Sequence, residues 1–144
     1  MKINVKSVIT SGLIAGLVIS LSAITMVPVV GNEMDMVLAS RGLPPLSKMD
    51  MLYFVVLSFI NGIGLILLYA LVKERLGAGI RTSVIVSVVY WFLTYFFSSI
   101  SLIVYGFMPV RLTVIGIIWG LGEILLAGVA GCKFYKEVKL KNAI

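Results

Sequence analysis

The segment from Leu112 to Cys132 reads LTVIGIIWGLGEILLAGVAGC, and Glu123 is the only charged side chain in it. A helix rises about 1.5 Å per residue, so a segment of this length matches the hydrocarbon core of a bilayer, about 30 Å thick. Glu123 lies roughly 18 Å along the helix from Arg111 and roughly 15 Å from Lys133, close to the midplane. An ionisable group at that depth is costly and is a candidate functional residue.

The rest of the chain is similarly apolar. Its 144 residues are 60% hydrophobic and 12% charged, with a mean hydropathy of +1.13, whereas a soluble domain carries about 25% charged residues. Four segments are long enough to cross a membrane, and we expect spans at about residues 8–30, 51–72, 82–106 and 110–132. The sequence therefore predicts an all-α integral membrane four-helix bundle that forms a single domain over residues 1–144.

The positive charges predict the orientation of the spans. Nine of the twelve lysines and arginines lie near the N-terminus, between the second and third spans, or after the fourth. Because loops rich in positive charge stay in the cytoplasm, we expect both termini to be cytoplasmic in an inner or plasma membrane. The first apolar run continues to Val30, beyond the length of a signal-peptide core, so we expect it to remain as an uncleaved span.

Residues 31–50 form the only sizeable segment expected outside the membrane. Asn32 is a candidate helix start and Gly42 a candidate helix end, which together predict a short helix in the first outer loop, lying in the membrane interface. Ser47 and Asp50 form a capping pair at the start of the second span. The segment is interpreted either as a connector or as a lid or docking loop.

Small residues form one face of the first span and one face of the fourth. Small residues four apart let helix backbones approach closely, so we interpret both faces as packing seams that can meet each other. Glu123 then faces protein, which is its own bundle, another copy or another subunit. The seams consist of Gly12, Gly16, Ser20 and Ala23 in the first span, and of Gly116, Gly120, Ala127 and Ala130 around Glu123 in the fourth.

Hydroxyl groups form a stripe along the third span. Two interpretations compete for it. In the first, each hydroxyl bonds to its own backbone and the small side chains fill a tight interface. In the second, the stripe lines a narrow polar path through the membrane. The stripe contains Ser83, Ser87, Tyr90, Thr94, Ser98 and Ser101.

Asn61 is the only carboxamide inside an expected span, and it lies at a depth similar to that of Glu123. A hydrogen bond between the two is possible if the second and fourth spans touch. Desolvation disfavours a charged carboxyl, so we expect a neutral Glu123. The neutral carboxyl then either forms a structural hydrogen bond or acts as an acid that can exchange its proton. The candidate intramembrane polar site comprises Glu123, Asn61, Tyr90, Thr94 and Ser87.

The chain contains one cysteine and no histidine, which narrows its chemistry. An intramolecular disulfide cannot form, and zinc, iron and haem sites of the ordinary ligand types are not expected. There is no nucleophile–base pair and no phosphate-binding loop, so we expect neither enzyme activity nor a cofactor. The basic residues are divided among short loops, which argues against nucleic acid as a partner.

Two groups of residues carry a resemblance to other sequences. The first is Leu68-Tyr69-Ala70 with Leu76-Gly77-Ala78-Gly79, and the second is Trp119-Gly120-Leu121-Gly122-Glu123 leading to Gly131 and Tyr135-Lys136-Glu137. With these residues the chain resembles small bacterial four-span membrane proteins that have no assigned activity. The resemblance implies a four-span topology and no particular mechanism.

Two functional hypotheses remain. The first is a non-enzymatic subunit or accessory protein that packs with itself or with a larger membrane complex, with the bilayer and another membrane subunit as its partners. The second is a small proton- or cation-coupled carrier or channel in which Glu123 is the coupling acid.

Overall fold

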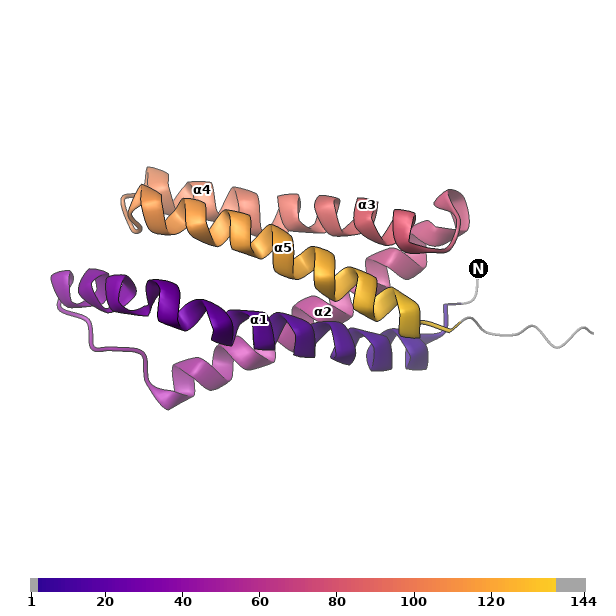
Figure 1. The fold of residues 1–144 in the computed structure, drawn as a ribbon, viewed down its shortest axis with the longest axis horizontal. Coiled ribbons are helices and arrows are strands. Elements are labelled where there is room, and N and C mark those ends of the chain that lie inside the picture. The colour runs from indigo at the N-terminus through magenta and orange to yellow at the C-terminus, as the bar shows by residue number, and fades with distance from the viewer. Residues whose placement is uncertain (1–2, 137–144) are drawn as a thin grey trace, which may run out of the picture.

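The computed structural model describes residues 3–136, and helices are its only regular elements in that range. They form four rods (Figure 1), each long and apolar enough to cross a membrane. The expected all-α four-helix membrane bundle is therefore confirmed. The elements in chain order are α1 (Val5–Ser40), α2 (Lys48–Leu76), α3 (Ile80–Trp91), the π-helical segment η1 (Phe92–Phe96), α4 (Phe97–Val104) and α5 (Val110–Phe134).

Side-chain caps and glycine turns fix where several helices begin and end. Ser47 and Asp50 form the expected capping box, in which the Asp50 carboxylate accepts from the Ser47 N–H at 2.8 Å. The turn between α2 and α3 contains Gly77 and Gly79 at positive φ, a conformation that residues with a Cβ rarely adopt. The Gly79 N–H donates to the Tyr69 hydroxyl at 3.0 Å. The turn is therefore fastened to α2.

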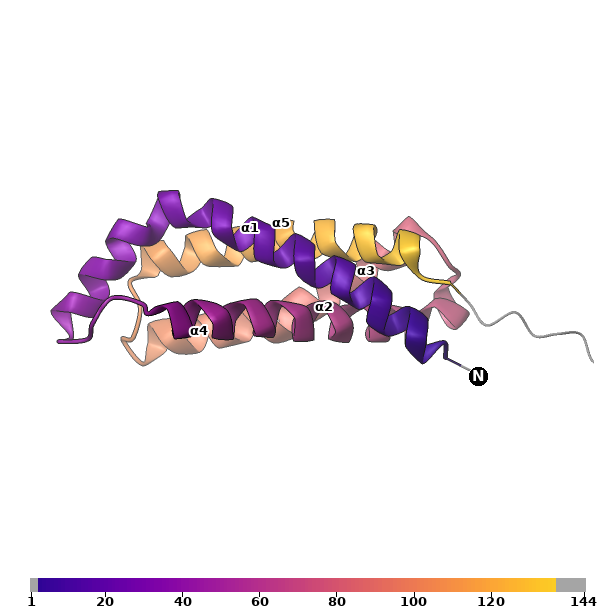
Figure 2. The same ribbon diagram turned by 90° about the horizontal axis from the view of Figure 1, so that it is seen from below.

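α1 is longer than the expected first span, because residues 32–40 continue the same helix. The prediction of a separate interfacial helix in the first outer loop is wrong. Pro28 lies within α1 and bends the helix rather than ending it, since a proline removes one backbone hydrogen bond. Figure 2 shows α1 changing direction in its C-terminal half.

Two contacts hold the end of α1 against the rest of the bundle. Glu33 forms an ion pair with Arg111 in the first turn of α5. Just after α1, the Arg41 guanidinium donates to the Gly106 carbonyl in the turn before α5, at 2.7 Å. These contacts explain why the helix continues past Gly31 and Asn32, where the sequence alone suggests a break.

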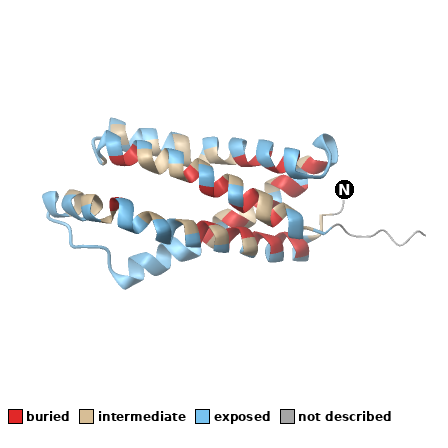
Figure 3. Ribbon diagram, in the orientation of Figure 1, coloured by how far each residue is buried: buried red, intermediate tan, exposed pale blue. Residues whose placement is uncertain are grey.

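The core lies in the half of the bundle where α1 begins and α5 ends, which we call the terminal half. Buried residues gather there in Figure 3. α1 packs against α2 and α5, and α3 packs against α5. The core cluster consists of Ala15, Ile19, Leu65, Ile66, Tyr69, Val86, Ile124 and Ala127.

The opposite half, which we call the loop half, is more open. Residues 48–56 at the start of α2 are all exposed, and within the described range α2 makes no contact with α4. Figure 1 shows the start of α2 diverging from α4 and α5. The exposed side chains here are mostly large and apolar, as expected for a helix surrounded by lipid.

Candidate functional site

Glu123 lies inside the bundle of its own chain. It is 7% exposed, and its Oε1 accepts a hydrogen bond of 2.6 Å from the Tyr95 hydroxyl of η1. Ser22 of α1 lies beside the same carboxyl and interacts with it. Among residues 3–136, no lysine or arginine pairs with Glu123. Side chains from two other helices therefore hold the carboxyl, and no cation does.

The π-helical segment brings Tyr95 to Glu123. Hydrogen bonds in a π-helix span five residues instead of four, so the side chains in and after the segment are rotated relative to an unbroken α-helix. The Tyr95 ring lies against Gly120 of α5, where a Cβ would be 2.5 Å from the Tyr95 Cδ1. The glycine thus provides the space for the ring. Single π-helical turns are rare and are frequently found at functional sites.

Asn61 forms a second polar pair, with Tyr90 near the end of α3. The Tyr90 hydroxyl donates to Asn61 Oδ1 at 3.0 Å, and Asn61 Nδ2 donates to the Leu57 carbonyl of its own helix at 2.9 Å. Gly64 gives the tyrosine room, since a Cβ there would be 2.9 Å from the Tyr90 hydroxyl oxygen. Both oxygen and nitrogen of the carboxamide are therefore satisfied.

The hydrogen bond that the sequence left possible between Asn61 and Glu123 is not formed. Each side chain bonds to its own tyrosine instead, and the two tyrosines belong to the rod that lies beside α5. Tyr90 and Tyr95 are close enough to interact electrostatically, so the two pairs adjoin. We call Asn61, Tyr90, Tyr95 and Glu123 the tyrosine cluster.

The hydroxyl stripe of the third span divides into two parts. Ser83 and Ser87 are buried against α5, where Gly128 meets the Ser87 hydroxyl closely. Farther along, the hydroxyl groups donate to carbonyls four residues earlier, and the last two residues are exposed. The stripe does not line a continuous interior path, because its last two residues lie at the surface. Its outer part agrees with the packing interpretation, whereas the buried Ser87 hydroxyl has no hydrogen-bond partner among the described residues. The backbone-bonded residues are Thr94 (2.7 Å), Ser98 (2.7 Å) and Ser101 (3.0 Å).

The small residues of α1 pack mainly on α2 rather than on α5. A Cβ at Gly12 would be 2.5 Å from the Ile63 Cα, and one at Gly16 would be 2.6 Å from the Phe59 Cα. Gly62 on α2 completes this contact, because a Cβ there would collide with the backbone of α1. The first seam therefore meets a glycine of α2 that sequence reasoning did not single out.

The seam of α5 is used within the chain as well. The Tyr95 ring packs on Gly120, and Ala127 is fully buried in the core. Farther along, Gly131 packs against Ile66 and Ala15. Gly116 is the exception, since nothing lies within 4 Å of the position of its missing Cβ.

Sequence reasoning missed the residues that contact the carboxyl and its surroundings. Tyr95 lies off the hydroxyl stripe when helical positions are assigned at 3.6 residues per turn, and no sequence signal marks the π-helical turn. Trp119 Nε1 donates to the Ser22 hydroxyl at 3.0 Å, and Trp91 Nε1 donates to the Ile117 carbonyl at 3.0 Å. An indole N–H deep in a span needs a hydrogen-bond acceptor. This requirement was the signal in the sequence that both tryptophans make polar contacts inside the bundle.

The described residues contain no group of three or more histidine, cysteine, aspartate or glutamate side chains that could hold a metal ion. Comparison of the chain with protein families, with curated proteins and with solved structures finds no match. The site must therefore be interpreted from its own geometry.

Proposed function

We propose that the protein is a small proton- or cation-coupled carrier in which Glu123 is the coupling acid. The observation that carries the proposal is the buried Glu123 carboxyl, held by the Tyr95 hydroxyl without a cationic partner in residues 3–136. A salt bridge would favour the charged form, whereas a hydroxyl both donates and accepts and so suits either protonation state. Such a carboxyl can exchange its proton for a cation.

The unequal packing of the two halves supports this proposal. Glu123 lies near the middle of α5, and the core residues Ile124 and Ala127 follow it toward the terminal half. On the other side α2 and α4 do not touch. A carrier exposes its central site to one side of the membrane at a time. This arrangement fits a state that is closed at the terminal half.

We also propose that the terminal half faces the cytoplasm of an inner or plasma membrane. The Asn4 carboxamide donates to the Lys136 carbonyl, and the rings of Tyr69 and Tyr135 make contact near the α2–α3 turn. The start of α1, the turn and the end of α5 are therefore together at one end, and the basic residues of these segments share one side. Retention of positive charge in the cytoplasm supports this orientation.

A second candidate is a non-enzymatic subunit or accessory protein that packs with itself or with a larger membrane complex. The exposed start of α2, residues 48–56, favours it, because this apolar surface has room for a neighbouring helix. Apart from Gly116, the glycines of the two seams are packed within the chain, so such a partner would bind mainly elsewhere. Neither candidate includes enzyme activity, a cofactor or a nucleic acid partner.

Proton flux in proteoliposomes tests the first candidate. Protein is reconstituted with an entrapped pH-sensitive dye, and Na⁺ or tetraphenylphosphonium is added outside. We expect the wild type to release protons from the lumen and Glu123→Gln to reduce the signal to that of protein-free liposomes, because an amide cannot exchange a proton. The matched control is Glu74→Gln, the same change at an exposed residue near the α2–α3 turn, which should retain the wild-type signal.

Two outcomes separate the candidates. If Glu123→Gln carries the same flux as the wild type, Glu123 is not the coupling acid and the carrier proposal fails. If the wild type shows no flux but purifies as a stable oligomer or with a second membrane protein, the subunit candidate is supported instead.

A further inference from the structure

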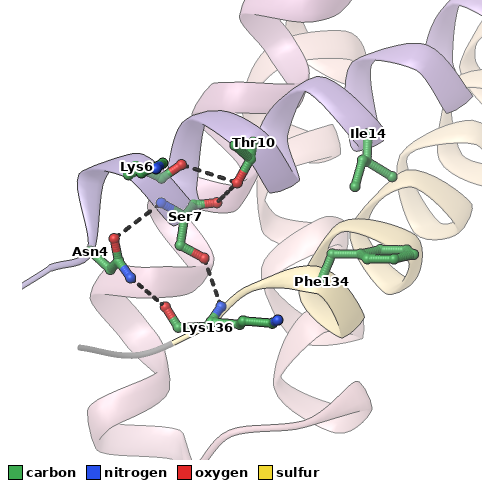
Figure 4. Close-up of a pocket in the computed structure, with 7 residues that line it drawn as sticks. All are labelled: Asn4, Lys6, Ser7, Thr10, Ile14, Phe134 and Lys136. Atoms are coloured by element: carbon green, nitrogen blue, oxygen red, sulfur yellow. Dashed lines mark hydrogen bonds between the residues drawn. The ribbon is translucent and has the colours of Figure 1, made fainter. Parts of the chain in front are cut away.

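We propose that a groove at the terminal end of the bundle binds the head group of an anionic phospholipid. The groove lies between the start of α1 and the end of α5 and has a volume of about 370 Å³. Figure 4 shows its residues, which come from two segments far apart in the chain. They are Asn4, Lys6, Ser7, Thr10, Ile14, Phe134 and Lys136.

The floor of the groove is preformed by three hydrogen bonds. Asn4 caps α1 by accepting from the Ser7 N–H at 3.1 Å, and its Nδ2 donates to the Lys136 carbonyl at 3.0 Å. The Lys136 N–H donates to the Ser7 hydroxyl at 2.6 Å. The two bonds to Lys136, dashed in Figure 4, tie the segment after α5 to the start of α1. They fix the backbone on the two sides of the groove before a ligand binds, which lowers the ordering cost of binding.

The described lining of the groove carries positive charge. Lys6 and Lys136 are exposed, and no carboxylate is among the described residues that line the groove. Neither ammonium group forms an ion pair or lies over an aromatic ring within the described part of the chain. Two lysines that line one groove can bind a phosphate group, with each ammonium group acting as a point charge.

The other side of the groove is apolar, which favours a lipid over a soluble phosphate. Ile14 follows Lys6 by eight residues on α1 and therefore lies roughly 12 Å deeper along the helix. Figure 4 shows Ile14 and Phe134 on neighbouring helices, beyond the hydrogen-bonded cluster. The positive charge at the membrane boundary matches the phosphate group of a lipid. The apolar side chains deeper in the membrane match its acyl chains. Basic pockets between membrane helices are known to bind anionic lipids in this way.

Native mass spectrometry of the delipidated full chain in detergent tests the proposal. The protein is mixed with equimolar phosphatidylglycerol and phosphatidylcholine, and the lipid retained by each protein ion is counted. We expect the wild type to retain phosphatidylglycerol preferentially, and the double variant Lys6→Gln/Lys136→Gln to bind it roughly tenfold more weakly. Both side chains are exposed and form no hydrogen bond or ion pair within residues 3–136, so the variant should fold, and its far-ultraviolet circular dichroism checks this. If the double variant loses helix, Lys6→Gln alone replaces it, with an expected loss of about threefold.

The matched control is Arg75→Gln/Arg81→Gln, which removes two exposed positive charges from the same end of the bundle but outside the groove. It should retain the lipid like the wild type, as should Lys6→Arg/Lys136→Arg. An equal loss in the control would mean general charge attraction and would overturn the proposal. So would equal retention of the two lipids by the wild type. Displacement of phosphatidylglycerol by equimolar inorganic phosphate would assign the groove to free phosphate instead.

Discussion

At the scale of single residues, the hydrogen bond between Tyr95 and Glu123 leads to a prediction about stability. Tyr95→Phe removes the donor and leaves the buried carboxyl without its 2.6 Å partner. Interhelical hydrogen bonds in membrane proteins contribute about 0.6 kcal/mol on average and up to about 1.7 kcal/mol. We expect Tyr95→Phe to lower the free energy of unfolding by about 1 kcal/mol, measured by titrating the protein in mixed micelles with sodium dodecyl sulfate.

The control for this measurement is Tyr105→Phe. Tyr105 is 73% exposed in the turn between α4 and α5, and its hydroxyl has no hydrogen bond in the described structure. Removal of this hydroxyl should change stability by less than about 0.5 kcal/mol. Equal effects of the two substitutions would show that the Tyr95 hydroxyl makes no specific contribution.

At the scale of elements, the extension of α1 depends on contacts that lie far away in the sequence. Arg111 pairs with Glu33, and the two side chains are 74% and 25% exposed. An exposed ion pair contributes about 0–1 kcal/mol, so Arg111→Gln should leave the bundle folded. We expect amide hydrogen exchange at residues 32–40 to become a few times faster while exchange in the core is unchanged.

Lys48→Gln serves as the comparison, because Lys48 is exposed at the start of α2 and its side chain forms no hydrogen bond or ion pair within the described structure. Its exchange profile should match that of the wild type. Unchanged exchange at residues 32–40 in Arg111→Gln would mean that the helix continues through its local sequence alone.

The helices themselves show what hydrophobicity can predict. The expected fourth span, residues 110–132, is close to α5, and the expected third span, residues 82–106, is close to the rod of α3, η1 and α4. Apolar length identifies the part of a helix that lies in lipid, but it does not show where the helix ends. For this reason the ten residues after Val30 were missed as part of α1.

The candidate site was harder to predict than the fold. Glu123 and Asn61 stand out because each is the only group of its kind in an expected span. Their partners do not stand out, because a tyrosine in an apolar helix is a common residue. With the one-residue change of register in η1, Tyr95 rather than Thr94 reaches α5, and its ring lies against Gly120.

At the scale of the whole molecule, the paired arrangement of the rods predicts the sidedness of two loops. The α2–α3 turn lies at the terminal end, and the start of α2 lies at the opposite end. In a Cys132→Ala background, single cysteines are placed at Arg75 and Lys48, and intact cells are treated with a membrane-impermeant maleimide. We expect the cysteine at position 48 to be labelled and that at position 75 to be labelled only after lysis. Labelling of both in intact cells would contradict the four-span arrangement.

The two indole hydrogen bonds have a consequence for spectroscopy. Trp119 and Trp91 are the only tryptophans of the chain, and both lie next to the tyrosine cluster: Trp119 bonds to Ser22 beside Glu123, and Trp91 bonds to the α5 carbonyl of Ile117. Intrinsic fluorescence of the unlabelled protein therefore comes almost entirely from two indoles next to the tyrosine cluster. Any event that moves a proton, a cation or a helix at this site should change the emission maximum or its intensity without an added dye.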